Sequence, residues 1–118
     1  MNVKRISNDG LQKILHNKVL APVTCVVKFY SNNCHLCHSL QEYYVQIANQ
    51  YELDSDIVFY AFNIDDDPSI SKMLKFEGVP TIAVVNPVPG SSQKLLSKHK
   101  VLSEPEKPND KTLSLIHI

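Results

Sequence analysis

The chain has 118 residues, 43% of them hydrophobic and 20% charged, which is the composition of one folded domain. Twelve Lys and Arg residues balance twelve Asp and Glu residues, so the charge gives no support to nucleic-acid binding. No apolar run approaches the roughly 20 residues that cross a bilayer. We therefore expect neither a nucleic-acid partner nor a membrane partner.

Residues 1–20 and the cysteine content indicate a reducing compartment. The N-terminal segment mixes charged side chains with isolated apolar ones, and it lacks the unbroken apolar stretch of a secretory signal. Three cysteines are too few for a disulfide scaffold, and two of them three positions apart are typical of redox chemistry or metal binding. We therefore expect a cytoplasmic protein.

Helices and short strands alternate along the chain. Apolar residues at steps of three and four predict amphipathic helices, and short runs of β-branched and aromatic residues predict buried strands. Residues 7–9 and Asn33 are expected to cap the first two helices, and Gly78 is expected to end the third. The predicted elements are a helix to about residue 18, a strand at 23–30, a helix at 34–51, a strand at 57–64, a helix from 68 to 78, and strands at 81–86 and 94–102.

This order of elements predicts an α/β fold with a mixed central sheet. Strands separated by helices pair in parallel through right-handed crossovers, whereas the last two strands form an antiparallel hairpin. We assign residues 1–102 to one domain and residues 103–118 to an exposed tether and a non-native tail. Residues 113–118 are similar to the in-frame translation of a sequencing adapter, so we expect a natural reading frame truncated near Thr112. A genuine apolar tail is the alternative.

Cys34 and Cys37 are the candidate redox pair. Residues three apart on a helix face the same way, so the two sulfurs can form a disulfide and open again with little backbone movement. At the start of a helix, free N–H groups and the helix dipole favour a thiolate. We predict that Cys34 is the more exposed nucleophile and that Cys37 resolves the mixed disulfide. Protonated His35 and His38 would add positive charge, unless they are plain surface residues.

The sequence around this pair resembles the thioredoxin family over roughly residues 22–87. The motifs that carry the resemblance are VVKFY at 26–30, CHLC at 34–37, FNID at 62–65 with Pro68, and GVPT at 78–81. The resemblance implies a thioredoxin-like three-layer α/β/α fold. It also implies a thiol–disulfide oxidoreductase that acts on protein disulfides, needs no cofactor and receives electrons from an unidentified donor. We expect a monomer.

The resemblance also assigns a substrate surface. It implies that Pro80 is a cis-proline facing the disulfide and that the backbone of Val79 pairs with an extended substrate segment. Asn33, His35 and Leu36 complete this expected surface. Asn33 stands where the family carries a tryptophan, so we expect more polar contacts with partners.

Two positions depart from the family pattern beneath the pair. Lys28 stands six positions before Cys34, where family members usually carry a buried acid, and Ala61 stands where a lysine is common. The usual buried ion pair is therefore absent or rebuilt. If Lys28 lies beneath the disulfide, we predict that it stabilises thiolates and makes the pair more oxidising. Alternatively, its stem packs and its amine reaches solvent.

Other interpretations of the motif remain open. The chain could be a thioredoxin-fold module that binds a partner with little or no redox turnover, or it could act on glutathione as glutaredoxins do. CHLCH at 34–38 also matches the pattern of covalent haem attachment. Cys34, Cys37 and a neighbouring histidine could contribute to a zinc site, although a closed four-ligand site is not expected. Cys25, within an apolar strand, is expected to be a core residue.

Overall fold

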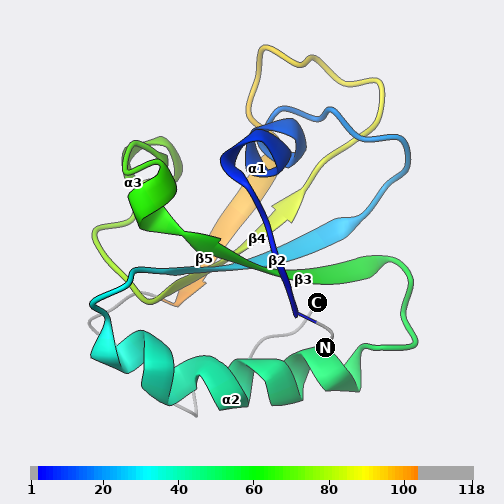
Figure 1. Cartoon of the computed structure of the whole chain (residues 1–118). Coiled ribbons are helices and arrows are strands. Elements are labelled where there is room, and N and C mark those ends of the chain that lie inside the picture. Colours follow the sequence, from blue (N-terminus) through cyan, green and yellow to red (C-terminus); the bar gives the residue numbers. More distant parts are fainter. Residues whose placement is uncertain (1–2, 104–118) are drawn as a thin grey trace.

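A five-stranded mixed sheet forms the centre of the molecule (Figure 1). The computed structural model describes residues 3–103, without the side chains of residues 35, 36, 38, 39 and 103. The strands are β1 (Val3–Arg5), β2 (Thr24–Tyr30), β3 (Ile57–Asn63), β4 (Thr81–Asn86) and β5 (Lys98–Ser103). Their order is β1-β3-β2-β4-β5, in which the first three run parallel and the pairings of β4 with β2 and β5 are antiparallel.

Three α-helices cover the two faces of the sheet within residues 3–103. The helices α1 (Asn8–Leu15) and α3 (Ile70–Leu74) lie on one face, and α2 (His35–Gln50) lies on the other (Figure 1). A short 3-10 helix, η1 (Ile64–Asp66), follows β3. These three layers confirm the predicted α/β/α architecture. None of these helices is long and apolar enough to span a membrane.

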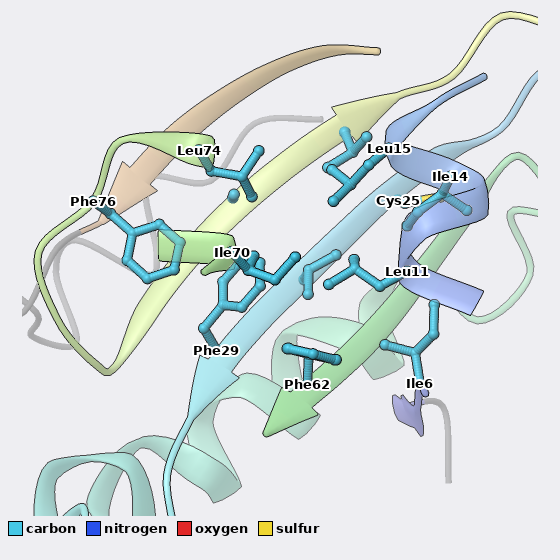
Figure 2. Close-up of a cluster of buried hydrophobic side chains, with 13 residues drawn as sticks. Ile6, Leu11, Ile14, Leu15, Cys25, Phe29, Phe62, Ile70, Leu74 and Phe76 are labelled. Atoms are coloured by element: carbon cyan, nitrogen blue, oxygen red, sulfur yellow. The ribbon is translucent and has the colours of Figure 1, made fainter. Parts of the chain in front are cut away.

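The face that carries α1 and α3 holds the larger hydrophobic cluster (Figure 2). Alternate residues of β2, namely Cys25, Val27 and Phe29, are fully buried in it, because successive side chains of a strand point to opposite faces. Phe29 packs edge-to-face on Phe62, with ring centroids 5.9 Å apart. Cys25 is free and buried, which confirms its predicted place in the core.

The face that carries α2 holds a second cluster. Val26 of β2, Phe59 of β3 and Tyr44 of α2 are buried in it. The Tyr44 hydroxyl donates a hydrogen bond to the carbonyl oxygen of Tyr60 (2.9 Å), and it also lies within hydrogen-bond distance of the Val26 carbonyl oxygen (3.2 Å). This bonding satisfies a polar group that would be costly to bury alone, and it fixes the tyrosine ring against the sheet.

The first two elements differ from the prediction. β1 has no predicted counterpart, because three residues are too few for a periodic pattern and only the pairing with β3 defines the strand. α1 ends at Leu15 rather than near residue 18. The reason is Asn17, which adopts a left-handed φ of 61° and whose side-chain oxygen accepts a hydrogen bond from the Val88 N–H (3.0 Å).

The ends of α3 and the start of β5 also differ. Lys75, with a left-handed φ of 63°, ends α3 in place of Gly78, and the early turn brings the Phe76 ring to 4.9 Å from that of Phe29. β5 begins at Lys98 rather than at residue 94, because the Ser97 N–H donates to the Leu15 carbonyl (2.7 Å) at the end of α1. The predicted tether and tail, from residue 104 onward, lie outside the described residues.

Candidate active site

Cys34 and Cys37 form a disulfide where β2 leads into α2. Their Cα atoms lie 5.2 Å apart, within the range that a disulfide requires. Cys34 is half-buried, whereas only 5% of Cys37 is exposed. Of the two sulfurs, a large partner therefore has better access to that of Cys34.

Cys34, and not Asn33, is the N-cap of α2. The backbone N–H of Cys37 donates to the Cys34 sulfur over 3.0 Å, in the position where an oxygen usually accepts this bond. The prediction is wrong because it followed the general preference for asparagine caps, whereas here the helix begins one residue later and Asn33 lies exposed in the preceding turn. The same N–H would stabilise a Cys34 thiolate after reduction.

A hydrogen-bonded bridge between two strand ends holds the turn before Cys34. The Asn63 side-chain amide donates to the side-chain oxygen of Asn32 (3.0 Å). The Asn32 N–H donates to the Asp65 carboxylate (3.4 Å), and the Asp65 N–H donates to the Asn63 side chain (3.0 Å). The sequence analysis missed Asn32. Polar residues at the ends of two neighbouring parallel strands were the signal that could have found it.

The turn before β4 lies at the same end of the sheet as the disulfide. Phe29, near the end of β2, is opposite Thr81 at the start of β4, so Val79 and Pro80 lie toward the segment that leads to Cys34. The Val79–Pro80 peptide bond is cis, the conformation that the family resemblance implies. Pro80 is buried and Val79 is half-buried.

Lys28 and Cys37 line one cavity of about 230 Å³ between the sheet and α2. Only 5% of Lys28 is exposed, so its stem packs between the sheet and α2, and the alternative that its amine reaches solvent stays a prediction. The Lys28 amine nitrogen lies 5.2 Å from the centre of the Tyr44 ring, which is a cation–π distance. The tyrosine ring that the Val26 and Tyr60 carbonyls fix in place therefore faces this amine.

The electrostatic environment of Lys28 follows from its burial. Loss of hydration disfavours the charged form, so burial lowers the pKa of the amine below its usual value. The strand register places Lys28 opposite Ala61, and no ion pair joins Lys28 to any side chain described within residues 3–103. The buried ion pair of the family is therefore not rebuilt by this part of the chain.

The remaining candidate residues lie in the first turns of α2. His35, Leu36 and His38 belong to this helix, but their side chains are outside the described part of the structure. Within the described residues, no group of three or more His, Cys, Asp and Glu side chains could hold a metal ion. In the disulfide form, the sulfurs of Cys34 and Cys37 bind each other rather than a zinc ion.

Comparisons with known proteins agree with this geometry. The thioredoxin family model matches residues 3–101, whereas no curated protein matches the chain. Chloroplastic thioredoxin z is 26% identical in sequence, with a TM-score of 0.58 over 76% of this chain and 75% of that structure's chain.

Two structures of ERdj5 superpose more closely at lower identity. The Trx4 domain is 10% identical, with a TM-score of 0.70 over 97% of this chain and 90% of that one. The J-Trx1 fragment is 16% identical, with a TM-score of 0.66 over 95% of this chain. This chain spans only 46% of the J-Trx1 fragment, and at these identities both likenesses show the fold alone.

Proposed function

The chain belongs to the thioredoxin family, and we propose that it exchanges disulfides with protein substrates through Cys34 and Cys37. A thioredoxin domain with a close cysteine pair supports thiol–disulfide oxidoreductase function. The observation that carries the finer proposal is the unequal burial of the pair, in which a half-buried sulfur caps α2 and a buried sulfur follows one turn later.

The exchange proceeds in two substitutions at sulfur. The Cys34 thiolate attacks a substrate disulfide, forms a mixed disulfide and releases one substrate thiolate. The Cys37 thiolate then attacks the Cys34 sulfur, which forms the Cys34–Cys37 disulfide and releases the second substrate thiolate. Two electrons pass from the cysteine pair to the substrate, and an external thiol donor must return the pair to its reduced form.

Five residues form the proposed substrate surface. Exposed Asn33 and half-buried Val79 support it, because both lie at the end of the sheet that carries the disulfide. In this proposal the backbone of Val79 pairs with an extended substrate, and Pro80 packs beside the reacting sulfurs. The first-turn residues His35 and Leu36 complete the surface.

Lys28 is proposed to modulate the pair. Its amine lines the same cavity as Cys37, and a nearby positive charge favours a thiolate over a thiol. Stabilising thiolates stabilises the reduced form, so the pair becomes more oxidising. The positive charge of Lys28 opposes its own burial, and the Tyr44 ring compensates part of that cost.

In this proposal the protein needs no cofactor and acts as a monomer in the cytoplasm. Residues 1–102 form its one domain. Its partners are protein disulfides and an electron donor that the chain does not identify. The contacts that support a single domain are the two hydrophobic clusters, one on each face of a single sheet.

Reduction of insulin disulfides by dithiothreitol tests the proposal. We expect catalysis by the natural chain, none by Cys34→Ser, and an accumulated mixed disulfide with Cys37→Ser. Cys25→Ser is the matched control, because Cys25 lies in the core away from the pair, and this variant should retain turnover. A chain that turns over only glutathione mixed disulfides would show glutaredoxin-like specificity. A well-folded chain that turns over nothing would instead be a partner-binding module.

A further inference from the structure

The cavity beneath the disulfide is lined by two cationic side chains. Lys28 of β2 and Arg5 of β1 both line it, and Arg5 is otherwise an exposed residue at its edge. No acidic side chain lines this cavity in the part of the chain that the structure describes. Lys28 is nine-tenths buried there, so its positive charge is poorly compensated by water.

The strand register places the small residue Ala61 between Lys28 and Arg5. Ala61 of β3 is the register partner of Arg5 on one side and of Lys28 on the other. Neighbouring strands are about 4.8 Å apart, so the two cationic residues flank Ala61 with only a methyl group between them. A ligand seated over Ala61 would be in reach of both side chains.

The size and walls of the cavity suit a small organic anion. Its volume is about 230 Å³, whereas one water occupies about 30 Å³ of the liquid, so a ligand of a few heavy atoms fits. Val3 and Val45 contribute apolar walls, and attraction between charges is stronger in such surroundings than in water. These features fit a carboxylate with a short apolar end.

We propose that this cavity binds a carboxylate, held by Lys28 and Arg5 over Ala61, and that the bound carboxylate favours the disulfide form of the cysteine pair. In the reduced protein, a Cys37 thiolate stabilised by Lys28 would be a second anion at this cavity and would repel the carboxylate. In the oxidised protein the cavity has no such charge. Because coupling between two equilibria is reciprocal, an anion that binds the oxidised form more tightly shifts the pair toward the disulfide. Only this redox effect rests on the proposed function.

The carboxylate has two sources, a free small molecule or an acidic side chain of a protein substrate. An NMR titration of the oxidised protein with sodium acetate, at constant ionic strength, tests the first. Titrations with two short peptides, identical except that one carries Glu where the other carries Gln, test the second source, an acidic side chain of a substrate. We expect saturable shifts of the Ala61 and Val45 amides with acetate, or with the Glu peptide alone if the substrate supplies the group.

Matched variants separate this site from general charge effects. Lys28→Met should abolish the saturable shifts, and Arg5→Gln should weaken binding several-fold. Lys4→Gln is the control, because Lys4 is exposed and absent from the cavity lining, and it should bind as the natural chain does. Shifts that survive in Lys28→Met, or no saturable shift with any probe, would overturn the site. These measurements need no turnover, so they can succeed even if insulin reduction fails.

The redox effect has its own measurement. In a redox buffer of 2-mercaptoethanol and its disulfide, which carry no carboxylate, the saturating probe should increase the ratio of disulfide to dithiol several-fold in the natural chain and not in Lys28→Met. An equal increase in both proteins would show that the probe does not act through Lys28, and the coupling would be wrong.

Discussion

Alternate residues of β2 point to opposite faces of the sheet, and the two faces place their side chains in different environments. On the side of α1 and α3, Cys25, Val27 and Phe29 are buried among apolar side chains. On the side of α2, Val26 belongs to a smaller cluster and Lys28 lines a cavity shared with Cys37. One face thus contributes mainly stability, while the other accepts a buried amine beside the redox pair.

This difference sets the energetic cost of burying an amine against the effect that we propose for it on the cysteine pair. Burying a charge without a paired carboxylate opposes folding, so the apolar face must contribute the surplus of stability. In return, an amine near Cys37 favours a thiolate. The comparison predicts that changes on the first face alter stability and leave the redox equilibrium alone, and that Lys28 does the reverse.

The largest effect is expected from the apolar face. Leu15→Ala in α1 removes a fully buried side chain and should lower the free energy of unfolding by about 2–5 kcal/mol. Urea denaturation of the oxidised protein measures this loss. The ratio of disulfide to dithiol in a glutathione buffer should stay unchanged. A large change of this ratio in Leu15→Ala would contradict the claim that the apolar face affects stability alone.

Cys25 should make the same face sensitive to alkali. Burial raises the pKa of its thiol from 9.0 to about 11, so between these values the folded state keeps a proton that the unfolded state loses. Stability therefore falls as pH rises through this range, by about 2 kcal/mol between pH 8.5 and 10.5. Cys25→Ala should reduce the fall by this amount, as measured by urea denaturation at both pH values. Parallel pH profiles for the two proteins would contradict the assignment.

Lys28→Met should shift the redox pair with little loss of stability. Removing the positive charge destabilises the thiolates, so the pair should become more reducing, by about tenfold in its equilibrium with glutathione, or about 30 mV. Lys28→Asp should shift it further in the same direction. Quantifying the alkylated thiols at equilibrium measures both shifts. An unchanged equilibrium in both variants would remove Lys28 from the redox mechanism.

The smallest effect is a pH dependence with the opposite sign to that of Cys25. Burial lowers the pKa of the Lys28 amine below 10.5, so between the lowered value and 10.5 the unfolded state binds more protons than the folded state. Stability contributed by Lys28 therefore rises with pH in this window. The Lys28→Met variant should lack this rise when its urea denaturation is compared with that of Cys25→Ala and of the natural chain.

Local patterns predicted most elements of the sheet and the redox pair. The strands β2, β3 and β4 and the helix α2 agree with prediction to within one residue at each end, because each has a strong periodic or β-branched pattern that acts over a few neighbours. The three-residue β1 and the early end of α3 could not be predicted this way. Pairing with β3 defines the first, and packing of Phe76 on Phe29 accompanies the second.

The amino-acid sequence alone specifies the spacing of the two cysteines and the lysine at the position where the family has an acid. The surroundings of that lysine depend on the folded structure, because they come from three other elements, β1, β3 and α2. Register brings Ala61 and Arg5 beside it, and α2 brings Tyr44 and Cys37 over it. The charge of a side chain is a local property, whereas its hydration and its neighbours depend on segments far apart in the chain.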